Sequence, residues 1–524
     1  MNYLKVAKAT ELYGRDKKIY RLLEILPGAL SVGSLLILII FSFVKPVWVA
    51  YFLIAFNVYW LLQVIFLGVY LLASYSKLKN NRKIDWQKKC EEIDSDVEFL
   101  PNNSLAKKGM RLEDIIHLII LPTYNEDIEI IRTCFLGLVN NNYPTEKMIV
   151  VLAIEERAGE EALFRAKSIE KEFSEKFRNF AFFVHPDNIE GELKGKGANQ
   201  SYAGKMAKKE IIDREGLDYE KIVVSVFDID TIASPGYFHC LSYKFLTVEK
   251  PYNASYQPIP VYHNNIWQTP FFARVSSASN TFWQMMQQIR PEKLATYSSH
   301  SMTFKALVDI GFWAPNMVSE DSRIFWHCFL HYNGDYRVEP LYFPVSMDAT
   351  CDKNFWQTIK SLYKQQRRWA WGSENVPYLI FNVIKRWSQL KIKKGQTLRH
   401  IWIQIYGFHS WATSALILGV IGWFPIIFGG SKFNDSVVFL NLPTTTQRLM
   451  TLAMSGLVLT SILSSIMLPK RPKNFGFINN LKLVVEWIFV PISVIVFGAI
   501  PCLDAQIRLM MGKYMGFWVT PKNR

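Results

Sequence analysis

The sequence lacks the regular cysteine spacing that a disulfide framework or a zinc site needs. It has only six cysteines among 524 residues. None of them is paired at a short spacing, and five fall in the polar middle of the chain, where we expect reduced thiols. We therefore predict no disulfide and no zinc site. His327 and His331 are spaced like metal ligands, but their neighbours are apolar, so we expect both to pack in a core.

The chain also lacks internal repeats, low-complexity tracts and a cleavable signal peptide. Its first apolar run starts at residue 28, behind a charged, helix-like segment of more than 20 residues, and no small-residue cleavage site follows it. Acidic residues are fewer than basic ones, 45 against 60, which leaves a formal charge of +15. The basic residues cluster beside apolar runs, so we predict that they meet anionic lipid headgroups and that the protein binds no nucleic acid.

Hydrophobic sequence is in excess: 50% of the residues are hydrophobic and 15% are aromatic, more than an ordinary soluble protein carries. The apolar residues are concentrated toward the two ends of the chain, in runs at 28–44, 47–75, 401–429, 449–468 and 483–502. A helix of about 20 apolar residues spans a bilayer. Lysines and arginines at both edges of the polar middle place that middle on the cytosolic side of the cell membrane, plasma or inner.

These boundaries predict a multi-pass membrane protein with five parts. They are an N-terminal segment with a two-helix transmembrane hairpin (1–75), a cytosolic domain (76–350), amphipathic interface helices (351–398), a C-terminal transmembrane region (399–503) and a cytosolic tail (504–524). Three full C-terminal crossings would leave the basic tail outside. We therefore expect residues 483–502, which contain Glu486 and two prolines, to form a re-entrant or interfacial segment.

The polar middle alternates short apolar runs with amphipathic ones. The sequence predicts strands at residues 115–121, 148–154, 180–185 and 221–227, and helices at residues 127–139, 159–176 and 197–208. This order is typical of a Rossmann-like α/β domain with a mostly parallel sheet covered by helices. Ligands of such domains bind beyond the carboxyl ends of the strands.

Three polar clusters follow these predicted strands and would share that edge of the sheet. They lie at residues 123–126, at Glu155 with Glu156, and at Asp228 with Asp230. Two carboxylates at a strand end suit Mg²⁺ or Mn²⁺ held against a diphosphate, although a single such cluster is also an ordinary turn. Three together imply a polar ligand, and a nucleotide fits. The glycines and lysines of residues 194–199 suit phosphate but do not form a Walker A loop.

These clusters, in this order, resemble the family 2 inverting glycosyltransferases, and more closely the processive membrane branch that includes cellulose, chitin and hyaluronan synthases. The resemblance implies a GT-A-type cytosolic domain flanked by transmembrane helices, a UDP-sugar donor and a polysaccharide acceptor. Residues 122–126 look like the family's first nucleotide-binding loop, which implies donor contacts from Thr123, Tyr124 and Glu126. Glu155 or Glu156 falls where the family has an acidic residue, usually Asp, that contacts uracil.

The remaining family motifs also have counterparts. Residues 196–199 resemble the family's Lys-Ala-Gly-Asn segment, which implies that Lys196 contacts the donor. Asp228 and Asp230 match its Asp-x-Asp, with Asp230 as the metal ligand and Asp228 beside it. Residues 319–321 stand where cellulose synthases have Thr-Glu-Asp, so the resemblance makes Asp321 the general base and puts Glu320 near the acceptor.

Two motifs lie toward the C-terminus. Residues 365–369 are a full Gln-x-x-Arg-Trp match, the signature of polymerising members, and the resemblance implies that Arg368 contacts the diphosphate while Gln365 and Trp369 contact the acceptor. Residues 517–522 resemble the Phe-x-Val-Thr-x-Lys gating loop of bacterial cellulose synthase, which implies donor contacts from Thr520 and Lys522.

The pattern favours a processive synthase that extends a β-linked polysaccharide and exports it across the membrane. One alternative is a non-processive transferase that moves one hexose or N-acetylhexosamine to a polyprenyl phosphate. It would not need the Gln-x-x-Arg-Trp motif, and its product would be a lipid-linked monosaccharide instead of a high-mass polymer. Another alternative, from a different class, is a transporter or channel with a cytosolic regulatory domain, in which Asp230→Asn or Asp321→Asn would leave flux intact.

Overall fold

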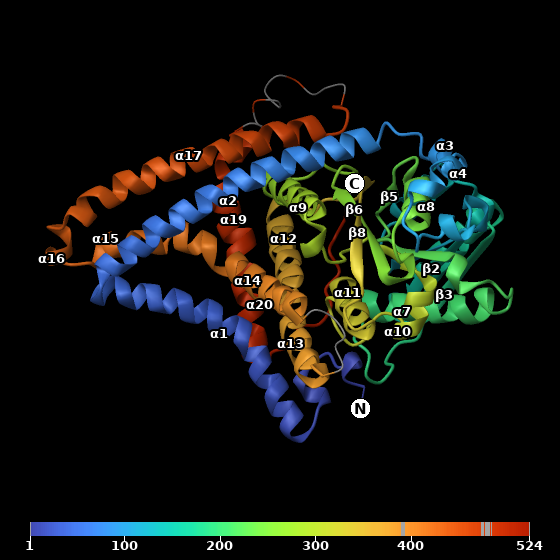
Figure 1. Ribbon diagram of the computed structural model, residues 1–524, viewed down its shortest axis with the longest axis horizontal. Coiled ribbons are helices and arrows are strands. Elements are labelled where there is room, and N and C mark those ends of the chain that lie inside the picture. The colour runs from blue at the N-terminus through green and yellow to red at the C-terminus, as the bar shows by residue number, and fades with distance from the viewer. Residues whose placement is uncertain are drawn as a thin grey trace.

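The structure, a computed structural model, describes residues 2–388, 394–472, 476, 481, 483 and 485–522. It consists of an α/β domain and an arm of long apolar helices that projects from it (Figure 1). The arm combines the first 80 or so residues with the last third of the chain. Segments at the two ends of the sequence therefore pack side by side, as the predicted pair of transmembrane regions requires.

The α/β domain is built on one mixed sheet with strand order β3-β2-β1-β4-β7-β6-β8-β5. The strands are β1 Ile116–Thr123, β2 Met148–Glu155, β3 Asn179–His185, β4 Ile222–Val226, β5 Ile232–Ala233, β6 Ala254–Val261, β7 Ser301–Thr303 and β8 Arg337–Ser346. The first four are the strands that the sequence predicts. They are parallel to one another, and β1 lies between β2 and β4.

Helices cover both faces of this parallel half. Every residue of β1 is buried, and its side chains alternate between two cores. Ile119 and Leu121 pack toward α5 (Ile128–Val139) and α6 (Gly159–Phe173), whereas Leu118 and Ile120 pack toward α7 (Lys196–Ala207). This two-sided burial explains the continuous apolar runs of β1 and β2. It also fixes the carboxyl ends of β1, β2 and β4 along one edge.

Sequence patterns do not predict the other half of the sheet, which contains β7, β6, β8 and β5. There β7 is antiparallel to both β4 and β6, β8 is parallel to β6, and β5 is antiparallel to β8. The strands β5 and β7 are too short to show a periodicity, and β6 contains Pro258 and Pro260, which interrupt a strand pattern and accompany a register shift after Gln257. The sheet is therefore mostly parallel only on the side of β3, β2, β1 and β4.

The remaining helices of the domain surround this second half. They are α3 Trp86–Glu91, α4 Ile93–Asp96, α8 Tyr237–Thr247, α9 Phe271–Ile289, α10 Phe304–Ile310, α11 Glu320–His331, α12 Phe355–Ala370 and α13 Asn375–Arg386. His327 lies buried in α11, where burial lowers its pKa to about 3, so it packs as a neutral side chain. All six cysteines are buried.

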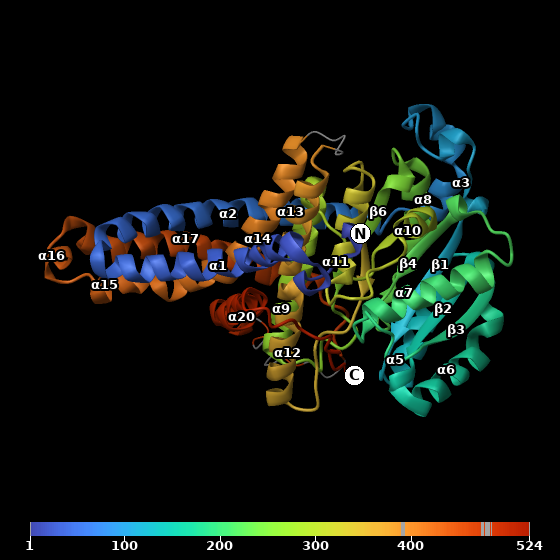
Figure 2. The same ribbon diagram turned by 90° about the horizontal axis from the view of Figure 1, so that it is seen from below.

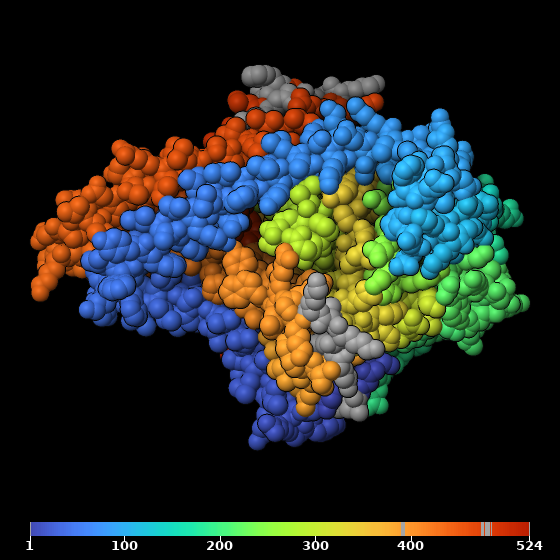
Figure 3. Space-filling model, viewed as in Figure 1, coloured from blue at the N-terminus to red at the C-terminus, as the bar shows by residue number. Residues whose placement is uncertain are grey.

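The arm contains the long apolar helices of both chain ends (Figure 2). The long ones are α1 Gly14–Val44, α2 Pro46–Asn81, α14 Lys394–Gly419 and α17 Val437–Met467, and the shorter α15 Phe424–Phe428, α16 Ser431–Asn434, α19 Val490–Val494 and α20 Ile500–Met510 lie among them. Helices α12 and α13 run across the direction of the arm, between it and the sheet. Figure 3 shows α2 extending from the tip of the arm to the α/β domain, where Asn81 Nδ2 donates to the Leu341 carbonyl at 3.0 Å.

By length and composition, four helices of the described residues can cross a membrane: α1, α2, α17 and the continuous helix Glu486–Met510. A fifth crossing would be α14 with α15, which are bent by 42° relative to each other. The re-entrant or interfacial segment that the sequence predicts at residues 483–502 stays a prediction, because Glu486–Met510 is a candidate span by length and composition alone; residue 484 lies outside the described residues. Pro491 and Pro501 lie in the first turns of α19 and α20, where this helix changes from one segment to the next.

The contact between α1 and α20 gives a stability prediction. A Cβ atom at Gly28 of α1 would lie 2.7 Å from the Gln506 carbonyl oxygen of α20, whereas a Cβ at Gly33 meets nothing within 4 Å. We expect Gly28→Ala to destabilise the protein by about 1–3 kcal/mol because the backbones must separate, and Gly33→Ala to leave stability unchanged or improve it. Thermal unfolding of both variants in detergent measures this, and equal midpoints would contradict the packing described here.

Candidate active site

Charged residues from four separate segments meet at the carboxyl edge of the sheet. Asp228 and Asp230 follow β4, Lys196 begins α7, Asp321 lies in the first turn of α11, and Lys522 lies in the C-terminal tail. Lys196 Nζ is 2.6 Å from Asp228 Oδ1 and 2.7 Å from Asp321 Oδ2. Lys522 forms an ion pair with Asp230. The structure thus brings together side chains that the sequence predicts to share one site.

The charges of this cluster support one another. Burial raises the pKa of Asp228, but the ammonium groups of Lys196 and Lys522 outweigh this effect and hold that pKa below its usual range. Burial lowers the pKa of Lys196, yet the carboxylates of Asp228 and Asp321 hold it well above its ordinary value. Asp228 and Lys196 therefore both stay charged at neutral pH.

The two carboxylates after β4 suit a hard divalent cation. Asp228 also accepts a hydrogen bond from Ser298 Oγ at 2.7 Å, and Asp230 accepts one from the Asp348 backbone N–H at 2.8 Å. The described residues contain no group of three or more metal-binding side chains, so the chain would supply two carboxylates and leave other positions to diphosphate oxygens, as Mg²⁺ commonly requires. A cation bound to Asp230 would take the place of the Lys522 ammonium. The donor set fits Mg²⁺ or Mn²⁺.

The start of α11 presents two carboxylate oxygens, Asp321 Oδ1 and Glu320 Oε2, that have no hydrogen-bond partner among the described residues. Asp321 Oδ2 accepts from Lys196, but Asp321 Oδ1 has no hydrogen-bond partner in the part of the chain that the structure describes. Its neighbour Glu320 is buried, and burial together with the charge of Asp321 raises the pKa of Glu320 to about 8. A Cβ at Gly197 would lie 3.2 Å from Glu320 Cβ, so α7 and α11 touch at their N-termini. This contact lets Lys196 reach Asp321.

The loop after β1 is closed by its own glutamate. Glu126 Oε2 accepts from Thr123 Oγ1 at 2.8 Å and from the Tyr124 N–H at 2.7 Å. Glu155, at the end of β2, is buried and accepts from Arg157 Nε at 2.6 Å, and the Arg157 guanidinium lies 4.4 Å from the centre of the Tyr124 ring. Sequence reasoning missed Arg157, because no motif spacing identifies it. Together these side chains form a polar cluster at the carboxyl ends of β1 and β2.

The Gln-x-x-Arg-Trp segment lies on α12, next to the start of α11. Gln365 Oε1 accepts from Thr350 Oγ1 at 2.6 Å, and the Arg368 guanidinium lies 4.9 Å from the centre of the Phe517 ring. Arg368 is close enough to Glu320 to act against the rise in its pKa. Trp369 packs against a small apolar cluster beyond these groups, made of Tyr262, Ile266, Met347 and Ala349.

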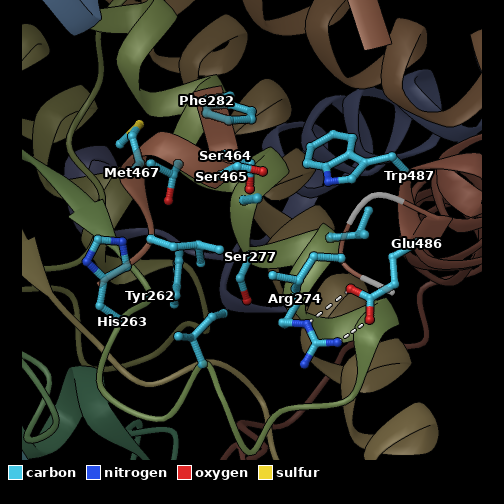
Figure 4. A pocket seen from close by; sticks show the side chains of 16 residues that line it. Tyr262, His263, Arg274, Ser277, Phe282, Ser464, Ser465, Met467, Glu486 and Trp487 are labelled. Carbon is cyan, nitrogen blue, oxygen red and sulfur yellow. Dashed lines mark hydrogen bonds and ion pairs between the residues drawn. The ribbon is translucent and has the colours of Figure 1, made fainter. Parts of the chain in front are cut away.

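A pocket adjoins this apolar cluster on the side of the arm (Figure 4). Tyr262 and His263 line one side of it, and the ion pair between Arg274 and Glu486 lies on the other. Phe282 and the end of α17 contribute further walls. Its lining mixes aromatic, hydroxyl-bearing and aliphatic side chains, and it shares Tyr262 with the cluster around Trp369.

The C-terminal tail reaches into the site at Gly195. Residue 195 has φ +149°, and a Cβ there would lie 2.5 Å from Cγ of Phe517, so only glycine lets the ring approach so closely. Beyond Phe517, Thr520 is buried, Arg368 Nη2 lies 3.5 Å from its Oγ1, and Lys522 pairs with Asp230. The segment that resembles a gating loop therefore covers the carboxylate cluster.

This contact gives a prediction that does not depend on catalysis. We expect Gly195→Ala to push Phe517 away and to speed amide hydrogen exchange in residues 516–521 several-fold, because the added methyl group overlaps the ring. Gly191→Ala is the matched control, since Gly191 also has positive φ but its Cβ would meet nothing within 4 Å. Equal exchange in the two variants would show that Gly195 does not hold the tail.

Comparison with known proteins gives a family. The family model for glycosyl transferase family group 2 matches residues 223–495, more than half of the chain. Poly-beta-1,6-N-acetyl-D-glucosamine synthase of Staphylococcus aureus (strain COL) is 38% identical over 103 residues, which are 19% of this chain and 23% of that protein. The synthase of Staphylococcus epidermidis is 36% identical over 89 residues, 17% of this chain and 18% of that protein. The chain thus matches less than a quarter of the length of these curated relatives.

Solved structures show weaker likeness. A mannosyltransferase from Pyrobaculum calidifontis in complex with GDP-Man and Mn²⁺ aligns with a TM-score of 0.38 at 12% identity, covering 84% of this chain and 99% of that one. S. aureus TarS 1-349 in complex with UDP-GlcNAc aligns with a TM-score of 0.32 at 13% identity, covering 65% and 91%. The predicted GT-A-type domain with apolar helices on either side agrees with the observed sheet, the arm and the family match. The chain belongs to glycosyl transferase family group 2.

Proposed function

We propose that this enzyme is an inverting glycosyltransferase that moves a hexose or N-acetylhexosamine from a UDP-sugar to the growing end of a β-linked polysaccharide and exports the product across the membrane. The observation that carries the proposal is the position of Lys196 between Asp228 and Asp321. One lysine joins a donor-side carboxylate to a carboxylate with a free oxygen. An inverting transfer needs these two groups close together.

The donor would lie along the carboxyl edge of the parallel strands. Glu155, Thr123 and Tyr124 would contact the nucleoside, and the cations of Lys196 and Arg368 would face the diphosphate. A divalent cation bound by Asp230 and Asp228 would supply further positive charge to the leaving diphosphate. Thr520 and Lys522 of the tail lie over the same place, so donor entry would require the tail to move aside.

The acceptor would approach from the side of α12. Its sugar ring would lie on Trp369, near Gln365 and Glu320, with its hydroxyl group directed at Asp321 Oδ1. That oxygen takes the hydroxyl proton while the acceptor oxygen bonds to the anomeric carbon, and the bond from that carbon to the diphosphate breaks with its electron pair on UDP. A single displacement of this kind inverts the anomeric configuration.

The product class is supported by three observations. Gln365, Arg368 and Trp369 complete the motif of polymerising members, a pocket on the side of the arm shares Tyr262 and Ile266 with the apolar cluster around Trp369, and the curated relatives are poly-N-acetylglucosamine synthases. UDP-N-acetylglucosamine is therefore the first donor to test. A lipid-linked monosaccharide in place of a polymer would favour transfer to a polyprenyl phosphate.

The proposed topology places residues 76–350 and the tail on the cytosolic side of the cell membrane, with residues 351–398 along its surface. In this topology α1, α2, the bent pair α14 with α15, and α17 cross the membrane, and residues 486–510 do not, which returns the tail to the side of the N-terminus. Phe428 at the end of α15 stacks on Phe43 at the end of α1, whereas Glu486 pairs with Arg274 of α9 in the α/β domain. The contacts agree with this parity: Tyr514 Oη donates to Glu24 Oε2 at 2.8 Å, and Arg21 Nη1 donates to the Leu509 carbonyl at 2.8 Å.

The base assignment gives the principal test. Purified protein in detergent with Mg²⁺ or Mn²⁺ is offered each nucleotide sugar in turn, and the release of UDP and the size and linkage of any product are measured. We expect a high-mass polymer from the wild type and a 10²- to 10⁴-fold lower kcat from Asp321→Asn, because the base is removed without a change of shape. Asp309→Asn on α10 is the control. Full activity of Asp321→Asn would contradict the assignment.

Metal removal gives a second test. We expect chelation by EDTA to abolish sugar transfer and added Mg²⁺ or Mn²⁺ to restore it, since the chain offers only two carboxylates and a diphosphate must complete the coordination. Asp230→Asn should weaken Mn²⁺ binding, measured by electron paramagnetic resonance in the presence of UDP, by about tenfold or more. Undiminished transfer in EDTA would exclude the proposed cation.

A further inference from the structure

We infer that Glu374 is a positioning residue that locks the helix carrying Asp321 to the helix carrying Trp369. This inference rests on the proposed function, because it concerns how the proposed base and the proposed acceptor site are held together. Glu374 follows α12 in a short 3₁₀ turn, Trp371–Glu374, and is buried. No sequence motif points to it.

The Glu374 carboxylate binds both helices at once. Its Oε1 accepts from the backbone N–H of Ser319 at 3.1 Å and from the Ser319 hydroxyl at 2.6 Å. Its Oε2 accepts from Trp371 Nε1 at 2.9 Å. Ser319 is the N-cap residue of α11, two positions before Asp321, and Trp371 stands two positions after Trp369. One carboxylate therefore joins residues that lie two positions from each of the two proposed functional residues.

The N-cap geometry makes this link specific. Ser319 forms no side-chain hydrogen bond to its own helix, although serine usually caps a helix in that way. Its hydroxyl is instead directed to Glu374, while its carbonyl accepts from the N–H groups of Ser322 and Arg323 at 3.2 and 2.9 Å. The position of Glu374 thus sets the first turn of α11, which contains Asp321.

The next residue strengthens the same junction. Asn375 Oδ1 accepts from Arg323 Nε at 2.6 Å, and Asn375 Nδ2 donates to Ser322 Oγ at 2.9 Å. The Arg323 guanidinium lies 3.7 Å from the centre of the Tyr378 ring and is buried. Adjacent side chains after α12 therefore hold three positions of the first turn of α11, so a movement of α12 is transmitted to Asp321.

The chemistry of the link requires a carboxylate. Three donors converge on Glu374, and only a carboxylate offers acceptor oxygens at both ends. Burial raises the pKa of Glu374, whereas the charge of Arg323 and the hydrogen bonds from Ser319 and Trp371 act in the opposite direction. Glutamine retains the shape and one oxygen, but it presents an NH₂ group to one donor and so breaks one side of the link.

The experiment compares Glu374→Gln, Trp371→Phe and the double variant, each purified as the full chain. We expect each single variant to lower kcat for sugar transfer about tenfold while UDP affinity, measured by calorimetry, and KM for the UDP-sugar change less than twofold. The double variant should be no slower than the slower single variant, since both remove the same hydrogen bond. Glu220→Gln, at the opposite end of β4, is the control for loss of a hydrogen-bonded carboxylate.

Variants of Ser319 form the second part of the experiment, because they test the same link without changing a large buried side chain. Ser319→Ala should lower kcat in the same way, and Ser319→Thr, which retains the hydroxyl donor, should restore it. A purely structural role would lower UDP binding and the unfolding temperature together with kcat, and the effects of the two single variants would add. Either of those results, or unchanged kcat in Glu374→Gln and Ser319→Ala, overturns the inference.

The same measurements separate this inference from the proposed function. A wild type that transfers sugar, an Asp321→Asn variant that does not, and a fully active Glu374→Gln variant would reject the role of Glu374 alone. A wild type that consumes no nucleotide sugar would reject the proposed function, and the positioning role with it.

Discussion

The buried Lys196 ammonium between Asp228 and Asp321 is the interaction on which the rest of the site depends. Two carboxylates that close together, withdrawn from water, would repel each other and favour protonation or separation. The lysine lies within 2.7 Å of both and removes that conflict. It therefore fixes the distance between the end of β4 and the start of α11, which come from segments more than 90 residues apart in the chain.

Contacts around the carboxylate cluster hold the Lys196 side chain in its position. The lack of a side chain at Gly197 lets α7 touch α11, and the lack of one at Gly195 admits Phe517, so the tail closes over the cluster and Lys522 neutralises Asp230. Glu374 ties α11 to α12 from the opposite side. The site is thus assembled from the sheet, the helices that lie across the arm, and the last residues of the chain, and the arm holds these parts together.

Part of this arrangement is readable from the sequence. The parallel strands can be predicted, because both of their faces are buried and each strand is one apolar run. The side chains of the carboxylate cluster and of α12 can be predicted as well, because each belongs to a family motif: Asp228, Asp230, Asp321 and Arg368. The antiparallel strands cannot be predicted from the sequence, since β5 and β7 are too short to show a periodicity and prolines interrupt β6. Sequence patterns also do not identify three residues whose roles arise from contacts between distant segments: Arg157, Ser298 and Glu374.

The measurement that tests the central claim most directly is UDP binding to Lys196→Met, compared with Lys205→Met on the exposed side of the same helix. Methionine keeps the volume of the lysine stem but leaves Asp228 and Asp321 without their shared cation. The account predicts at least a hundredfold loss of UDP affinity in Lys196→Met and none in Lys205→Met. Wild-type UDP affinity in Lys196→Met would contradict the claim that this ammonium group holds the site together.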